Sequence, residues 1–223
     1  MKKIISVLIL AFCCTVWAND FIDAKNAYDK EDYVKALHLY RTAANEGHVE
    51  AMFYLGVMYD NGMGVEQDYV EAMNWYKKAA AQGDTSSQYN IGYLYLNGHG
   101  VKNDDIEALK WFRQAAEKGD VDAEGMIGHM YHAGLGVKSD YAEAFRWFMK
   151  AAEKDHTISQ HNLGVMYRDG QGLPQDHVRA YLWFSLAADA DEDALKMRDE
   201  LSKKMTPRQI TKAKDMAKEW LAR

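Results

Sequence analysis

Cysteine and basic residues are too scarce in this 223-residue chain to support several common kinds of function. Its two cysteines, Cys13 and Cys14, lie near the amino terminus, so the chain from residue 15 onward has no disulfide and must be held together by packing. Lysine and arginine number 27 against 33 aspartates and glutamates, a net charge of −6. This balance argues against binding to nucleic acids or to anionic membrane surfaces, because both favour basic protein faces.

Long apolar runs are also lacking, apart from one at the amino terminus. Lys2 and Lys3 precede an apolar stretch that begins at Ile4 and ends at Ala18. This order of charged, apolar and small residues is typical of a secretory signal peptide, so we expect residues 1–18 to be cleaved off. An uncleaved anchor would need roughly 20 apolar residues, and lipid attachment at a cysteine would need a small residue before it. We expect a periplasmic mature protein, or alternatively a secreted one, with no integral membrane segment.

The rest of the sequence repeats itself with a step of 36 residues. Glycine, tyrosine, tryptophan and Gly-x-Gly columns each recur at this step. The columns are Gly56, Gly92, Gly128 and Gly164; Tyr59, Tyr95, Tyr131 and Tyr167; Trp75, Trp111, Trp147 and Trp183; and the pairs Gly62/Gly64, Gly98/Gly100, Gly134/Gly136 and Gly170/Gly172. A fixed period in this range indicates a solenoid of stacked supersecondary units.

The first half of each unit is predicted to be a helix. In the first unit this helix covers about residues 49–60, and Leu55 and Tyr59 belong to its apolar, core-facing side. Gly56 is expected to let a neighbouring helix approach closely. The helix is expected to end at Gly62, because glycine accepts the left-handed conformation found after helix ends.

The second half of each unit is predicted to be a helix that begins at an aspartate. Asp68 is the expected N-cap, and Glu71 is its expected capping-box partner; in the fourth unit Asp176 keeps the cap but Arg179 replaces the partner. The apolar stripe of this helix should lie in the core, and it contains Ala72, Trp75, Tyr76, Ala79 and Ala80. We therefore interpret the tryptophan column as core, in preference to a ladder for stacking ligands.

These boundaries give the predicted order of segments. They are a signal peptide (1–18), an N-terminal helical hairpin (19–46), four repeats (47–82, 83–118, 119–154 and 155–190) and C-terminal capping helices (191–223). In the last segment Thr206 and Pro207 form a strong helix start, and the helix that follows should cover the open end of the solenoid. Asp155 and Asp191 replace the glycine found at earlier boundaries.

One unit reads Ala51-x3-Leu55-Gly56-x2-Tyr59-x2-Gly62-x-Gly64-Val65-x6-Ala72-x2-Trp75-Tyr76-x2-Ala79-Ala80-x2-Gly83. This pattern resembles the Sel1-like repeat, a relative of the tetratricopeptide repeat with a longer loop, over roughly residues 20–223. The resemblance implies an all-α fold, an α/α right-handed superhelix (solenoid) of helix-turn-helix repeats whose first helices line a concave face. It also implies a role in assembling other proteins, or in envelope and secreted functions of bacteria. Some secreted relatives are described as penicillin-binding proteins or weak β-lactamases, typically with a cysteine pair in each repeat, which this chain lacks.

A second face of the first helices is predicted to bind a partner. Phe53, Val57 and Asp60 lie about 200° from Leu55 on a helical wheel, so they point away from the core side. We expect this row, continued in the later repeats, to bind a protein or peptide, with apolar contacts at one end and a cationic end at the other. The predicted partner-binding residues are Phe53, Val57, Tyr89, Asn90, Tyr93, His129, His132, His161, Asn162 and Arg168. The alternative is that these side chains pack against neighbouring repeats.

Motifs for catalysis, cofactors and metals are weak or missing. Each Gly-x-Gly follows a predicted helix instead of a strand, and Gln67 stands where a phosphate loop would need its third glycine. His129 and His132, with His161 one repeat later, are too few for a metal site. The sequence has no Gly-x-Ser-x-Gly or Ser-x-x-Lys. We predict a non-enzymatic binding protein without cofactor or metal; the alternatives are a hydrolase of cell-wall or β-lactam substrates and a secreted host-directed effector.

Overall fold

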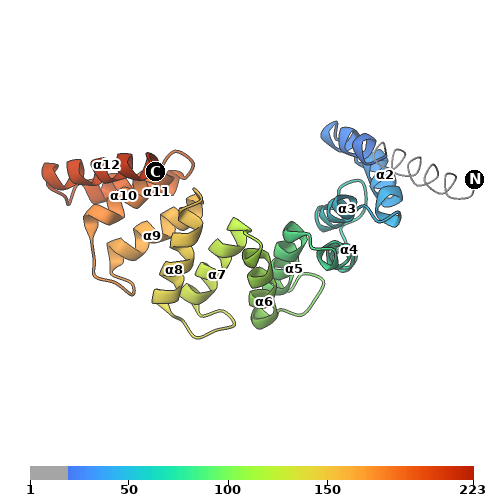
Figure 1. The fold of residues 1–223 in the computed structure, drawn as a ribbon, viewed down its shortest axis with the longest axis horizontal. Coiled ribbons are helices and arrows are strands. Elements are labelled where there is room, and N and C mark those ends of the chain that lie inside the picture. Colours follow the sequence, from blue (N-terminus) through green and yellow to red (C-terminus); the bar gives the residue numbers. More distant parts are fainter. Residues whose placement is uncertain (1–19) are drawn as a thin grey trace, which may run out of the picture. The chain divides into compact units, whose positions relative to one another are not determined.

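The computed structural model describes residues 20–223, in which every regular element is a helix (Figure 1). The predicted signal peptide lies outside these residues. After a helical stretch at 20–29, the elements are α2 (Tyr33–Asn45), α3 (Val49–Asn61), α4 (Tyr69–Ala81), α5 (Thr85–Asn97), α6 (Asp105–Glu117), α7 (Val121–Ala133), α8 (Tyr141–Ala152), α9 (Thr157–Asp169), α10 (His177–Ala187), α11 (Glu192–Ser202) and α12 (Pro207–Leu221). Helices that follow one another pack together, as in α2–α3, α3–α4 and α4–α5 and again in α7–α8, α8–α9 and α9–α10, so the predicted all-α fold of paired helices is confirmed. Within the described part of the chain, no helix could cross a membrane.

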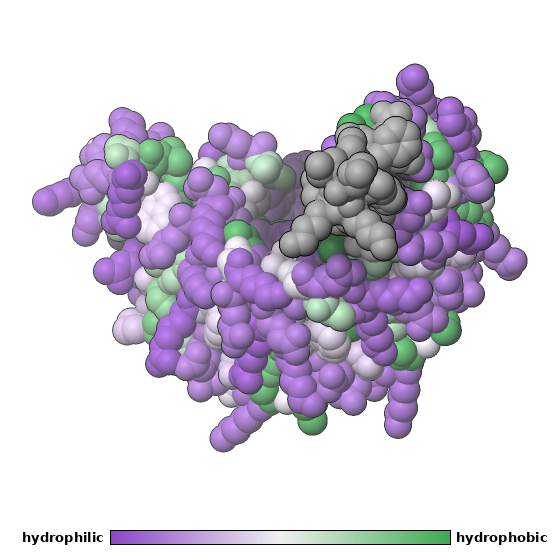
Figure 2. Space-filling view, turned by 45° about the vertical axis from the view of Figure 1, so that its right-hand side comes forward, coloured by the Kyte–Doolittle hydropathy of each residue, from purple (hydrophilic) through white to green (hydrophobic). Residues whose placement is uncertain are grey.

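The helices belong to two compact units, which are described separately. One unit runs up to Trp111 and the other covers Phe112–Arg223, so the division falls within α6. In both units the two helices of one repeat make a hairpin, as in the pairs α3–α4, α7–α8 and α9–α10. The surface seen in Figure 2 is mostly hydrophilic, with apolar residues scattered over it.

The four repeat hairpins are closed by the same backbone contact. Gly62 ends α3 in the left-handed conformation, with φ at 69°, as the sequence predicts. The carbonyl of Tyr59 then accepts a hydrogen bond from the N–H of Asp68 at 2.9 Å. Three later hairpins repeat this contact. Its members are Asp104 to Tyr95, Asp140 to Tyr131 and Asp176 to Tyr167, at 2.9–3.0 Å.

This contact explains a correction to the predicted capping box. The Asp68 carboxylate caps α4, because it accepts from the N–H groups of Val70 and Glu71 at 2.9 and 3.0 Å. The N–H of Asp68 is already bound to Tyr59, so Glu71 does not receive it and the expected box is wrong. A complete capping box is formed at Thr206, whose side chain and backbone both bind Gln209.

The space beside Gly56, Gly128 and Gly164 is filled by an aromatic ring from the second helix of the same hairpin. A Cβ added to Gly128 would lie 2.6 Å from Cδ1 of Phe148, and one added to Gly164 would lie 2.5 Å from Cδ1 of Phe184. Gly56 meets the ring of Tyr76 in the same way. The close approach predicted from these glycines is therefore confirmed, and it fixes how the two helices of a hairpin cross.

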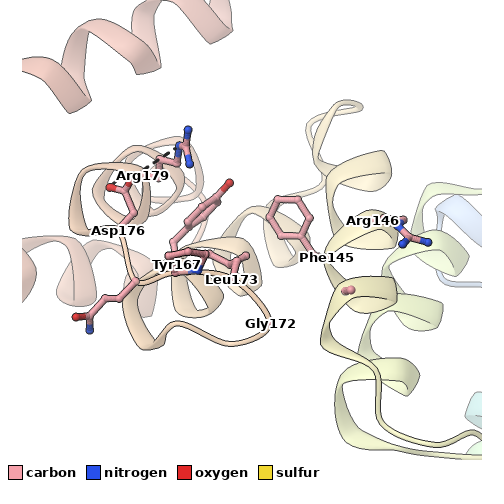
Figure 3. A pocket seen from close by; sticks show the side chains of 10 residues that line it. Phe145, Arg146, Tyr167, Gly172, Leu173, Asp176 and Arg179 are labelled. Atoms are coloured by element: carbon pink, nitrogen blue, oxygen red, sulfur yellow. Dashed lines mark hydrogen bonds and ion pairs between the residues drawn. The ribbon is translucent and has the colours of Figure 1, made fainter.

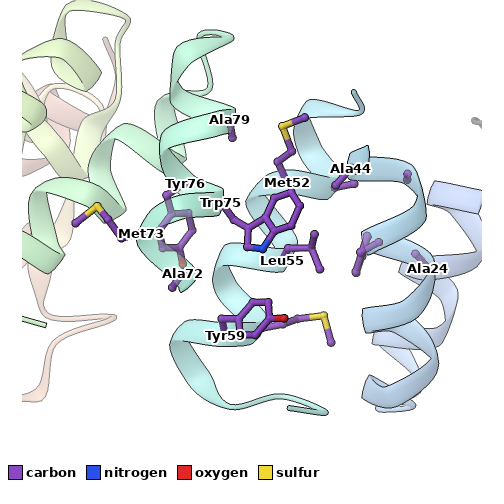
Figure 4. Close-up of a cluster of buried hydrophobic side chains, with 14 of the residues drawn as sticks. Ala24, Ala44, Met52, Leu55, Tyr59, Ala72, Met73, Trp75, Tyr76 and Ala79 are labelled. Atoms are coloured by element: carbon purple, nitrogen blue, oxygen red, sulfur yellow. The ribbon is translucent and has the colours of Figure 1, made fainter. Parts of the chain in front are cut away.

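The predicted core stripe is buried in the first unit. Figure 4 shows Trp75 and Leu55 in one cluster with their neighbours, and every member of the stripe is buried: Ala72, Trp75, Tyr76, Ala79 and Ala80. The tryptophan column packs as predicted, with Trp75 and Trp183 buried and the two between them partly buried. These side chains are therefore not available as a ligand ladder.

The second loop glycine joins neighbouring repeats. Gly64 has φ at 70°, and a Cβ added there would lie 2.5 Å from the carbonyl carbon of Tyr33, at the start of the preceding hairpin's second helix. Gly172 approaches Tyr141 equally closely, with the added Cβ 2.5 Å from the Cβ of Tyr141. At these positions any side chain would push two adjacent hairpins apart.

The C-terminal helices cover the last hairpin, as expected for capping helices. Helix α12 packs on α10, and Ala213 is completely buried between them. Trp220 meets Trp183 edge to face, with ring centres 4.7 Å apart. The apolar side of α12 therefore closes the core of the second unit.

Candidate functional site

The predicted partner-binding row begins in the first unit with two side chains that are partly buried. Phe53 packs against the rings of Tyr54 and Tyr76, with ring centres 5.4 and 6.2 Å apart. Val57 packs against the same core cluster. For these two residues, packing uses much of the surface that the row would offer a ligand.

Asp60 and Asn90, the next polar side chains of the row, both hydrogen-bond to the hydroxyl of Tyr76. Tyr76 donates its hydroxyl to a carboxylate oxygen of Asp60 at 3.2 Å, and Asn90 also hydrogen-bonds to it. Burial raises the pKa of Tyr76, and the Asp60 charge adds to that effect. Burial also raises the pKa of Asp60 above its usual range. Asn90, predicted to bind a ligand backbone, thus has a partner inside the fold, while Tyr89 beside it is partly buried.

Tyr93 is the most open apolar member of the predicted row. It is 44% exposed, and its ring lies edge-on to His99 with ring centres 6.4 Å apart. His99 in turn stacks on Tyr69, at 4.5 Å and an interplanar angle of 23°. We call these three residues the Tyr93 patch; the first two come from the end of α5 and its loop, and Tyr69 begins α4.

In the second unit the histidines of the row are mostly engaged with later segments. His132 shares a hydrogen bond with the Gln171 side chain at 2.8 Å, and His161 shares one with the carboxylate of Asp191 at 2.6 Å. His129, by contrast, is exposed. Among residues 20–223 no three histidine, cysteine or acidic side chains are grouped to hold a metal.

The cationic end of the row is neutralised by its neighbour. Arg168 pairs with the adjacent Asp169 through two hydrogen bonds of 2.7 Å. The arginine lowers the pKa of Asp169, and the aspartate raises that of Arg168. Asn162 is partly buried nearby in sequence. The row thus offers a ligand less free charge than the sequence suggests.

A pocket that the row does not include opens beside the loop of the last full repeat. It has a volume of about 500 Å³ and lies between α8, the loop at 170–176 and the start of α10 (Figure 3). It is lined by Ala142, Phe145, Arg146, Tyr167, Gly172, Leu173, Pro174, Gln175, Asp176 and Arg179. Phe145 and Tyr167 meet edge to face, with ring centres 5.7 Å apart and planes at 84°.

The sequence carries a signal for this pocket, because the fourth repeat breaks its own pattern there. Pro174 replaces a charged residue, and Arg179 replaces a glutamate, relative to the three earlier repeats. The residues at those positions are Glu66, Lys102 and Lys138 for the first, and Glu71, Glu107 and Glu143 for the second. A search for departures from the repeat would have drawn attention to these two positions.

Comparison with known proteins places the repeats in a family. The family described as Sel1 repeat matches residues 28–48, 49–84, 85–120, 121–156 and 157–192. These boundaries fall two residues after those predicted, and they add a short segment in the N-terminal hairpin. Comparison with curated proteins finds no match.

Solved structures of similar sequence include a Sel1 repeat protein from Oxalobacter formigenes. It is 31% identical with a TM-score of 0.76, over 92% of this chain and 84% of that one. A protective antigen of uropathogenic Escherichia coli strains, described as displaying an SLR fold, is 34% identical with a TM-score of 0.78 over 84% of this chain. This chain spans 41% of that antigen's length. An immunity protein from Pseudomonas aeruginosa, 18% identical with a TM-score of 0.53 over 90% of this chain and 80% of that one, shares the fold alone.

Proposed function

Since the chain belongs to the Sel1 repeat family, whose members generally act as protein-interaction scaffolds, we propose that it binds a protein partner and catalyses no reaction. The bound segment is an extended peptide or a helix that brings apolar side chains to the first-helix face. The amino-terminal sequence supports a periplasmic site of action, with release from the cell as the alternative.

The Tyr93 patch is the observation that carries this proposal. Aromatic side chains with one open face are common anchors of protein interfaces, because they bury a large area while losing little rotamer freedom. Tyr93 keeps 44% of its surface exposed, although its ring is already oriented by His99. A partner side chain that covers this ring would bury apolar surface without disturbing the core.

Photo-crosslinking in living cells tests the proposal directly. Tyr93 is replaced by a benzophenone amino acid in the full-length protein, and the crosslinked products are identified by mass spectrometry. The control places the same amino acid at Ile106, which is 58% exposed on α6 and lies outside the predicted row. We expect a discrete partner band at position 93 that the control does not give.

A second variant separates binding from folding. Tyr93→Ala should weaken recovery of that partner in a pull-down and leave the helical signal and melting temperature unchanged. Equal crosslinking from positions 93 and 106, or a Tyr93→Ala variant that unfolds, would contradict the proposed role of the patch. Fractionation of periplasm and culture medium decides between the two proposed locations.

A further inference from the structure

We propose that the pocket beside the loop at 170–176 binds an acidic peptide segment, in which a large apolar side chain stands next to an aspartate or glutamate. The inference deepens the proposed function, because it rests on a protein partner, but it concerns a different surface. All its residues belong to the second unit, whereas the Tyr93 patch belongs to the first.

The walls of the pocket are the open edge of a hydrophobic core. Phe145, Tyr167 and Leu173 are partly buried and pack against the buried cluster of α8, α9 and α10. Figure 3 shows their side chains between α8 and the loop. The volume of about 500 Å³ is within the range of small-ligand sites, which also combine apolar walls with a few polar groups. A leucine or phenylalanine side chain placed here would extend the core instead of sitting on a polar surface.

The mouth of the pocket is held in place before any ligand arrives. The loop contacts α8 closely at Gly172, and Gln175 donates its side-chain amide to the carbonyl of Arg168 at 2.6 Å. The N–H of Asp176 binds the carbonyl of Tyr167 at 2.9 Å. Pro174 has a fixed φ and no N–H of its own. A ligand therefore pays little to order this loop, which favours binding.

The charge at the rim selects an acidic ligand. The Arg179 guanidinium lies 5.6 Å from the centre of the Tyr167 ring, and its side chain is 54% exposed. Its contact with Asp176 is loose, at 3.7 Å, and the other oxygen of that carboxylate caps α10. The guanidinium thus keeps donors for a carboxylate, which arginine binds in a planar, two-bond geometry.

The same position in the other repeats shows why the site is confined to this junction. Glu71, Glu107 and Glu143 stand where Arg179 stands, so the earlier loops lack the cation that a carboxylate ligand would need at this position. Arg146 also borders the pocket, but it is paired with Glu143 and lies across α8 from Phe145 (Figure 3). Arg179 is therefore the residue that distinguishes this pocket chemically.

Defined peptides test the proposal on the whole mature protein. The probe is a fluorescein-labelled peptide, Gly-Ser-Asp-Leu-Phe-Asp-Ser-Gly, amidated at its carboxyl end. A second peptide replaces both aspartates by asparagine, and a third replaces the leucine and phenylalanine by serine. Fluorescence anisotropy measures affinity, and methyl NMR shifts of Leu173 locate the bound peptide. We expect saturable binding of the first peptide and at least tenfold weaker binding of the other two.

A pair of charge reversals completes the test. Arg179→Glu, which restores the residue type of the other repeats, should weaken binding at least tenfold. Lys212→Glu makes the same charge change at an exposed position of α12, outside the pocket, and should leave the affinity unchanged. Circular dichroism confirms that both variants fold.

Several outcomes would overturn the inference. They are equal binding of the aspartate and asparagine peptides, no loss of affinity in Arg179→Glu, and no saturable binding at millimolar concentration. Crosslinking from position 93 is repeated in the Arg179→Glu background. If the peptide results contradict the pocket while a partner is still captured from position 93, the pocket inference fails and the proposed function stands.

Discussion

Adding one methyl group to Gly128 is expected to destabilise the second unit. An alanine Cβ would lie 2.6 Å from Cδ1 and 2.7 Å from Cε1 of Phe148, whereas carbon atoms in contact prefer roughly 3.5–4.0 Å. Phe148 is 1% exposed, so its ring has no solvent to move into. The ring or the two helices must therefore shift by about 1 Å.

The size of the effect follows from two opposing terms. Overpacking a tight core costs about 1–3 kcal/mol, while replacing glycine by alanine inside a helix gains roughly 0.5–1 kcal/mol. We expect Gly128→Ala to lower the free energy of unfolding by about 1 kcal/mol, which is the difference between the middle values of these two ranges. Phe148→Leu should relieve the clash. The double variant should therefore lose less unfolding free energy than the sum of the losses in the two single variants.

Urea denaturation followed by circular dichroism and tryptophan fluorescence measures these energies. The double-mutant cycle should give a favourable coupling of at least about 0.5 kcal/mol, as for residues in contact. His129→Ala changes an exposed side chain on the same helix and should stay within about 0.5 kcal/mol of the parent. The reasoning would be refuted if Gly128→Ala were as stable as the parent, or if the Gly128 and Phe148 effects simply added.

Two further predictions concern charged groups inside the fold. Glu124 has a fully buried side chain and binds Lys150 and Lys154 at 3.0 and 2.8 Å. Replacing both lysines by methionine should lower the free energy of unfolding by about 1–3 kcal/mol, because the buried carboxylate then loses both cations. The loss is limited because the lysine side chains are partly exposed. Glu124→Gln in that background should restore most of the urea midpoint, as Gln88 and Gln160 occupy the same position; no recovery would contradict the role of the charge. Because burial raises the pKa of folded Asp60, the folded state binds more protons there, and this part of the stability should fall as pH rises from the unfolded pKa through the folded one. Asp60→Asn should remove this contribution to the pH dependence of the melting temperature between the unfolded and folded pKa of Asp60. An unchanged pH profile would argue against a raised pKa of Asp60 in the folded protein.

The sequence predicts the hairpins well because their determinants are local. Gly62 ends α3 and Asp68 caps α4 through contacts within a few residues. The capping box failed for the opposite reason, since the N–H of Asp68 binds a carbonyl on the preceding helix. A pattern of residue types indicates which groups can form hydrogen bonds, but not which of several possible partners a group binds in the fold.

The candidate site shows the same limit more strongly. A helical wheel places His132 and His161 on an open face, but their partners, Gln171 and Asp191, come from 39 and 30 residues further along the chain. Tyr93 meets the ring of His99 edge-on and still stays 44% exposed. The pocket depends on Arg179, a departure visible in the sequence whose surroundings only the fold supplies.

The contact between Gly64 and Tyr33 sets a rule for how this array can change length. The loop glycines Gly64, Gly100 and Gly172 contact the hairpin before them, at Tyr33, Tyr69 and Tyr141. Removing or duplicating one whole repeat would recreate the same contact between adjacent hairpins. An insertion of another size within a repeat would change which residues of adjacent hairpins face each other. We therefore expect changes in length by complete 36-residue repeats to preserve these contacts.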